Sequence, residues 1–292
     1  MSTNNCKNTV IPFGIEEEYS QYETSKFHVI SVPYAKTVSY IKGAENGPDA
    51  ILKASEQVEL YDIATESEPY LEGISYEEIN TNVELPVIWE EMKEKVYKCI
   101  NHNKFPVLLG GEHSITHGGI MGCKEKYNDL CILHIDAHCD LRTDYLGDKY
   151  SHACALRYAF DENTPIVQIG IRSAEKEEHT LIKNNPDKIK TFFANEEKLN
   201  NKEVLNNIKS KNVYLTIDID GFDPSIIPHT GTPEPGGLGW YEVLKLLEEL
   251  FKNYNVIAAD IVELCPSETS TVSDFTAAKL LYKLFALKNK GL

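Results

Sequence analysis

Short apolar runs alternate with amphipathic stretches along most of the chain, and the two patterns predict strands and helices in turn. The runs that predict buried strands lie at 27–33, 105–109, 130–135, 165–170, 189–193, 212–217 and 256–261. The stretches with helical spacing lie at 47–58, 85–101, 115–127, 177–183, 199–208, 241–254 and 271–287. This alternation predicts an α/β fold, a three-layer α/β/α arrangement with a mainly parallel central sheet. Nothing marks a linker, so residues 1–292 are expected to form a single domain.

Some segments allow more detailed predictions. In the helix at 85–101, Val87, Met92, Val96 and Ile100 have the spacing of an inward face. The stretch 62–82 is acidic and irregular, which is typical of surface. The C-terminal helix begins at Thr271-Val-Ser-Asp274, which is similar to a capping box.

Three of the predicted strands end in side chains that commonly bind metal ions. These candidate ligands are His113, Asp136, His138, Asp140, Asp218 and Asp220. Parallel strands present their carboxyl ends at one edge of a sheet, so the six side chains are expected to meet there. Imidazole and carboxylate groups without thiolates suit manganese, zinc or iron. Four carboxylates in one pocket would repel each other, which favours two metal ions with shared ligands.

Composition narrows the classes of function. The formal net charge of −16 argues against nucleic acid and anionic membranes as partners and is compatible with cationic substrates, although acidity for solubility explains it as well. Seven cysteines without a C-x-x-C pair do not suggest a disulfide framework. No long apolar window or leader-like N-terminus is present, so a soluble cytoplasmic protein is expected.

Five motifs in order resemble the ureohydrolase family of arginases and agmatinases. They are Gly-Gly-Glu-His-Ser (110–114), Asp-Ala-His-Cys-Asp (136–140), Ser-His-Ala-Cys (151–154), Asp-Ile-Asp-Gly-Phe-Asp-Pro (218–224) and Gly-Thr-Pro-Glu-Pro-Gly-Gly (231–237). Glu112 stands where the family often has Asp. The resemblance implies the same α/β/α fold, a small cationic guanidino substrate and a homo-oligomer, either a trimer or a hexamer.

The resemblance also implies roles for individual residues around two manganese ions. His113 and Asp140 would bind one ion and His138 and Asp220 the other, with Asp136 and Asp218 bridging both. His152 occupies the position of the family's catalytic proton shuttle. Without the family, a histidine in a loop is more simply read as solvated.

Other residues near the motifs are expected to bind substrate or support the site. Glu263 matches the catalytic carboxylate that accepts hydrogen bonds from the guanidinium, although alone it could be an exposed acid at a strand end. Thr232 would shape the pocket floor. Asp223, before a proline, is expected to be structural. His134 and Cys139 are expected to face away into packing, with His134 as a third ligand the alternative.

The loop between Asp140 and His152 bears on the substrate. Arg142 and Lys149 stand near positions where arginases carry the Asn and Ser that hold the α-carboxylate of arginine. Both cations are expected to face solvent or nearby acids, with a substrate carboxylate as the alternative partner. Glu175 and Glu178 are candidates to bind a second amine.

The resemblance therefore implies an agmatinase, a manganese enzyme that releases urea and putrescine from agmatine. The alternatives are a hydrolase of N1-aminopropylagmatine, guanidinobutyrate or arginine, and a metal-binding scaffold without turnover.

Overall fold

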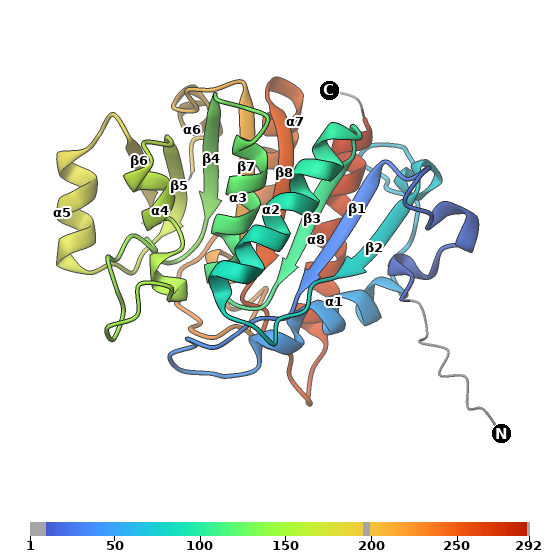
Figure 1. The fold of residues 1–292 in the computed structure, drawn as a ribbon, viewed down its shortest axis with the longest axis horizontal. Helices are drawn as coiled ribbons and strands as arrows, with labels where there is room; N and C mark the ends of the chain where they lie inside the picture. The colour runs from blue at the N-terminus through green and yellow to red at the C-terminus, as the bar shows by residue number, and fades with distance from the viewer. Residues whose placement is uncertain (1–9, 195–198, 291–292) are drawn as a thin grey trace.

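The computed structural model describes residues 10–194 and 199–290, which surround one eight-stranded sheet (Figure 1). All neighbouring strands are parallel, in the order β2-β1-β3-β8-β7-β4-β5-β6. The strands are β1 (Phe27–Val32), β2 (Ile74–Glu78), β3 (Phe105–Gly110), β4 (Leu130–Ile135), β5 (Ile166–Ile171), β6 (Ile189–Phe193), β7 (Asn212–Asp218) and β8 (Asn255–Val262). The predicted parallel α/β fold is confirmed.

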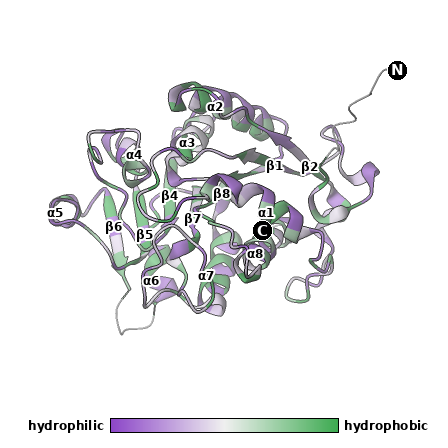
Figure 2. Ribbon diagram, turned by 90° about the horizontal axis from the view of Figure 1, so that it is seen from below, coloured by the Kyte–Doolittle hydropathy of each residue, from purple (hydrophilic) through white to green (hydrophobic). Residues whose placement is uncertain are grey.

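Helices cover both faces of this sheet (Figures 1 and 2). One layer contains α2 (Leu85–Asn101), α3 (Thr116–Lys124) and α4 (Arg157–Asp161). The opposite layer contains α1 (Gly47–Ser55), α6 (Asn201–Asn206), α7 (Trp240–Asn253) and α8 (Val272–Asn289). A further helix, α5 (Lys176–Asn184), lies beside the edge strand β6. Each layer encloses its own apolar core, so most strands are buried on both faces.

Helix α2 begins and ends where the sequence predicted, but the prediction that Val87 faces inward was wrong. Val87 is 57% exposed, whereas Ile88 is fully buried. Ile88 lies four residues before Met92 and eight before Val96, so it continues their stripe along the helix. Val87 is turned about 100° away from that stripe.

Three other expectations differ from the structure. The segment 62–82 contains the strand β2, which pairs only with β1 at the edge of the sheet and buries little beyond Ile74 and Ser75. An edge strand this short leaves no apolar alternation to detect. At the start of α8, the Thr271 side chain makes no capping hydrogen bond. The predicted helix at 115–127 is divided into a 3₁₀ turn, His113–Ile115, followed by α3.

The four central strands β3, β8, β7 and β4 are neighbours, and the chain leaves the carboxyl end of each into a loop carrying candidate residues. The loop after β3 lies close against the loop after β1. A Cβ atom on Gly111 would lie 2.1 Å from the carbonyl oxygen of Tyr34, so only glycine permits this approach. The amide of Glu112 donates to the same carbonyl at 2.8 Å. This contact fixes the position of His113 above the sheet.

Candidate metal centre

His113 is the centre of a first group of converging side chains. Its Nδ1 atom is buried and, within the described part of the chain, has no hydrogen-bond partner of acceptable geometry. Three carboxylate oxygens surround this atom, at 2.9 Å from Asp140, 3.2 Å from Asp136 and 3.5 Å from Asp218. Ligand atoms that each lie about 2.1 Å from one ion are separated by roughly 3 Å or slightly more. The spacing therefore fits a bound cation.

A second group lies beside the first and shares one carboxylate with it. His138 Nδ1 is 3.0 Å from Asp220 Oδ2 and 3.5 Å from Asp136 Oδ1. Asp136 thus directs Oδ2 toward His113 and Oδ1 toward His138. One oxygen in each group is the arrangement expected of a carboxylate between two ions.

The charges of this cluster are poorly balanced by protein alone. Burial, followed by repulsion from Asp220 and Asp136, raises the pKa of Asp218 well above its usual value. Burial and the charge of Asp136 raise the pKa of Asp220 as well. Divalent cations between these oxygens would remove the repulsion, so the donor set suits hard metal ions.

Two residues of the site adopt backbone conformations that non-glycine residues rarely take. Asp140 has φ 52° and Glu263 has φ 67°, both in the left-handed region. Such strain costs about 1–3 kcal/mol and is concentrated at functional sites. At Asp140 the turn directs the loop after β4 back toward His113, and at Glu263 it turns the chain after β8 toward the same place.

A cavity of about 260 Å³ opens onto both groups. The residues in its lining that the sequence analysis named are His138, Asp140, Arg142, His152, Glu175, Glu178, Asp218, Asp220, Thr232 and Glu263. Glu263 Oε1 accepts a hydrogen bond from the amide of His113 at 2.6 Å, and burial raises the pKa of Glu263, as does the charge of Glu112. Thr232 Oγ1 lies 3.5 Å from Asp220 Oδ2. The fold therefore brings the predicted residues together.

Thr37 and Glu112 are part of the site, although the sequence assigned no role to either. The Thr37 hydroxyl donates to Glu112 Oε1 at 2.9 Å, and Glu112 also accepts from the Thr37 amide at 2.7 Å. The same hydroxyl lies 3.0 Å from His152 Nδ1. Thr37 lies in an irregular loop, so neither periodicity nor a motif could have indicated it.

A second unpredicted pair, Thr216 and Asp260, holds the His113 ring from the side of the sheet. His113 Nε2 is 2.8 Å from the hydroxyl of Thr216, which donates to Asp260 Oδ1 at 2.6 Å. The carboxylate of Asp260 only accepts, so Thr216 must accept from His113 Nε2–H, and Nδ1 is the ring nitrogen that faces the three carboxylates. A signal for this pair existed, because Asp260 is a single acid inside the predicted buried strand at 256–261.

Among the supporting residues, His134 differs from its prediction and Asp223 agrees with it. His134 does not face away from the site, since its Nε2 lies 2.7 Å from Asp136 Oδ2. The expectation was wrong because residues two apart in a strand share a side, so His134 follows Asp136. Cys139 is buried in packing, as predicted. Asp223 accepts from the amides of Ser225 and Gly236 in a turn, which confirms its structural role.

The cations of the loop after Asp140 have partners of their own. Arg142 Nη1 forms an ion pair with Glu175 Oε1 at 2.7 Å, and its guanidinium lies over the Tyr145 ring at 4.9 Å. Lys149 lies over the ring of Tyr150. Arg142 therefore pairs with an acid, although with Glu175 and not with an acid of its own loop.

Comparison with known proteins agrees with this geometry. The model of the arginase family matches residues 25–286. The chain belongs to the arginase family. It is 37% identical to an N(1)-aminopropylagmatine ureohydrolase of Synechocystis sp. over 92% of this chain and 90% of the relative. It is 34% identical to an agmatinase of Halalkalibacterium halodurans, over 91% of this chain and 93% of the relative.

The structure of this arginase family member also resembles that of a solved relative. The agmatine ureohydrolase of Thermoplasma volcanium superposes with a TM-score of 0.85 at 31% identity and covers 93% of this chain and 92% of that one. The family resemblance inferred from the motifs is confirmed. The chain is a ureohydrolase that acts on a guanidino compound, and its two His/Asp groups are consistent with a binuclear metal site. Among the residues described here, no helix is long and apolar enough to span a membrane.

Proposed function

We propose that the chain is a binuclear manganese enzyme that hydrolyses the guanidinium group of agmatine, releasing urea and putrescine. The observation that carries this proposal is one cavity that both His/Asp groups share with His152, Glu263 and the acidic residues Glu175 and Glu178. A cationic substrate with a guanidinium at one end and an amine at the other matches these features.

The residues that would hold the ions follow from the distances. His113 and Asp140 would hold one ion and His138 and Asp220 the other. Asp136 would bridge them, and Asp218 is assigned the second bridge from the family motif. When bound, the two cations supply a water nucleophile at neutral pH and offset the charges of the carboxylates.

Two side chains of the cavity would act on the substrate itself. Glu263 is held by the amide of His113 through one oxygen, which leaves its other oxygen to accept from the guanidinium and orient that planar group. His152 would carry a proton to the departing amine, because Nδ1 faces Thr37 and leaves Nε2 for the exchange.

The part of the cavity lined by Arg142, Glu175 and Glu178 favours an amine over a carboxylate. Arg142 is the arginine that the described residues contribute to the cavity lining, and it is already paired with Glu175 and stacked on Tyr145. Glu178 adds a buried carboxyl group that accepts from the amides of Leu141 and Glu175. A substrate carboxylate would have to break the ion pair, whereas a second amine would meet acidic groups.

N1-aminopropylagmatine is the second candidate, because the Synechocystis relative and two Thermus thermophilus relatives at 34% identity carry that name. Urea release should be compared for agmatine, N1-aminopropylagmatine, guanidinobutyrate and arginine as kcat/KM. We expect one of the first two to exceed arginine by orders of magnitude. A preference for guanidinobutyrate or arginine would contradict the acidic-site argument, and no urea from any of the four would support a metal-binding scaffold.

A further inference from the structure

A row of polar side chains crosses the sheet beside the candidate metal centre, two residues before Asp136 on β4 and two before Asp218 on β7. Its members are partners in register on five adjacent strands, β8, β7, β4, β5 and β6. We call Asp260, Thr216, His134, Gln168 and Thr191 the polar row. The first four are fully buried, so each of their polar atoms needs a partner.

The hydrogen-bond directions at Gln168 are set by its neighbours. Gln168 Nε2 lies 2.8 Å from the carbonyl oxygen of Cys139, which can only accept, so this amide atom must be the nitrogen. Gln168 Oε1 accepts from the Thr191 hydroxyl at 3.0 Å, which agrees with that orientation. The second hydrogen of the amide points to His134 Nδ1 at 3.0 Å. His134 Nδ1 is therefore an acceptor and carries no proton.

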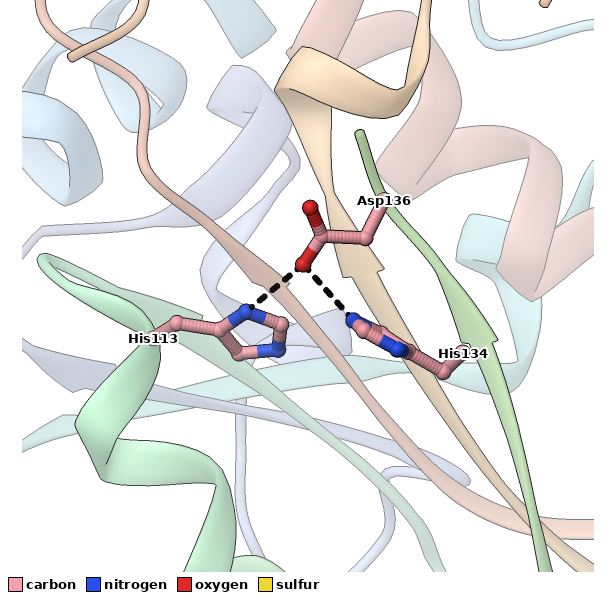
Figure 3. Close-up of side chains that lie close together, drawn as sticks. All are labelled: His113, His134 and Asp136. Atoms are coloured by element: carbon pink, nitrogen blue, oxygen red, sulfur yellow. Dashed lines mark hydrogen bonds and ion pairs between the residues drawn. The ribbon is translucent and has the colours of Figure 1, made fainter. Parts of the chain in front are cut away.

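The proton of the His134 ring must then lie on Nε2, 2.7 Å from Asp136 Oδ2. A ring nitrogen that carries a proton has no lone pair for a metal ion. His113, His134 and Asp136 lie close enough to be mistaken for three ligands of one ion (Figure 3). The ring of His134 donates to Asp136 there, whereas His113 directs Nε2 toward Thr216 and Nδ1 toward the carboxylates.

We infer that His134 is a positioning residue, which fixes the Asp136 carboxylate for two metal ions without binding either. Gln168 holds His134 in place, and Thr191 in turn holds Gln168. The inference rests on the proposed function, because it takes Asp136 as the ligand that both ions share. Asp136 Oδ1 accepts from the amide of His138 at 2.5 Å, so each oxygen has one donor and free lone pairs remain on both. Rotation of this carboxylate is thereby restricted before any ion arrives.

Measuring Mn²⁺ binding to variants shows whether His134 is a positioning residue or a ligand. His134→Phe keeps a planar ring but removes the donor to Asp136, and Gln168→Met removes the donor to His134 without touching Asp136. Mn²⁺ affinity and stoichiometry are measured by titration and metal analysis of each purified protein. Loss of such a supporting partner weakens metal affinity by about 10–100-fold. We expect that loss for His134→Phe, a smaller one for Gln168→Met, and two ions per chain at saturation in both.

A matched control distinguishes this role from general destabilisation. Ser75 is a buried hydroxyl of the sheet on the edge strand β2, where it contacts His28 and Ser25. Ser75→Ala should lower the melting temperature and leave Mn²⁺ affinity unchanged. One ion lost from His134→Phe would show that His134 is a ligand, and unchanged affinity in both variants would show that it positions nothing.

The tautomer can be measured directly if His134→Phe does not fold. In the metal-free wild-type protein labelled with ¹⁵N-histidine, we expect His134 to show a one-bond N–H coupling at Nε2 and none at Nδ1. A proton on Nδ1 would overturn the inference. Failure of the proposed function would be a separate result. Wild-type protein that binds no Mn²⁺ would show that the proposed metal site is wrong, whichever tautomer His134 has.

Discussion

The hydroxyl of Thr37 lies 3.0 Å from His152 Nδ1 and also accepts from the His152 amide at 3.0 Å. Its own proton goes to Glu112, so the hydroxyl can only accept from His152. The proton on Nδ1 is thereby held in place, and Nε2 is the nitrogen available to exchange a proton with substrate. This relationship assigns a function to a threonine outside every motif.

Thr37→Val should therefore slow turnover without changing metal content. Valine has the same shape but removes the nearer acceptor of His152 Nδ1, leaving only the longer contact with Ser151 Oγ at 3.3 Å. Losing such a partner costs about 1–3 kcal/mol, or roughly ten- to a hundredfold in kcat. The pH dependence of kcat should also shift. Thr37→Ser keeps the hydroxyl and should restore turnover. Equal activity in the valine and serine variants would show that Thr37 only fills space.

His152→Asn tests the proton shuttle itself. We expect kcat to fall by about 10²–10⁴-fold, the usual contribution of a general acid or base, with both metal ions retained. Added imidazole should restore part of the activity. If turnover and its pH profile stay as in the wild type, His152 is an ordinary loop residue.

Asp136→Asn tests the shared ligand. The amide removes one negative charge and one of the two oxygens that face His113 and His138. We expect both manganese occupancy and urea release to fall, as measured by metal analysis and kinetics on the same sample. Full activity with one ion per chain would contradict a two-metal mechanism.

Removal of metal should make stability depend on pH. Burial and neighbouring carboxylates raise the pKa of Asp218 and Asp220, so the folded metal-free protein binds more protons than the unfolded chain. Its stability should therefore fall as pH rises above about 4, the ordinary pKa of these groups. His138 acts in the same direction, because burial opposes its charge but Asp136 and Asp220 raise its pKa to about 12. Its stabilising effect is complete below its unfolded pKa and is lost as pH rises.

The measurement is the difference in melting temperature between Mn²⁺-loaded and chelator-treated protein at about pH 6 and about pH 8.5. We expect a larger difference at the higher pH, because the bound cations replace the protons that the carboxylates lose. A difference that does not change with pH would show that the cluster is not the source of the instability.

Glu175→Gln tests how the part of the cavity lined by Arg142, Glu175 and Glu178 selects substrate. The variant removes a negative charge and releases Arg142 from its ion pair. We expect KM for agmatine to rise while kcat and metal content stay close to wild type, because the Glu175 carboxylate pairs with Arg142 and not with a residue of either His/Asp group. Arginine should become a better substrate once Arg142 is free. Arg142→Ala is the matched variant, and it should leave arginine as poor a substrate as before.

The sequence by itself determined the order of strands and helices and the ligand-type residues at three strand ends. It could do so because a two-residue period and a 3.6-residue period are local properties, as is a motif such as Asp-Ala-His-Cys-Asp (136–140). It also indicated Glu263 through its place at the end of a predicted strand. The edge strand β2 escaped because its pairing with β1, and not its own apolar pattern, makes it a strand.

The tertiary structure alone decided the hydrogen bonds that join residues far apart in the chain. Thr37 meets His152 across 115 positions, and Thr216 meets His113 across 103. Arg142 is paired with Glu175 because the loops after β4 and β5 lie side by side at one edge of the sheet. These partners depend on strand order and register, which no local pattern encodes, and at His134 and His152 they fix which nitrogen carries a proton.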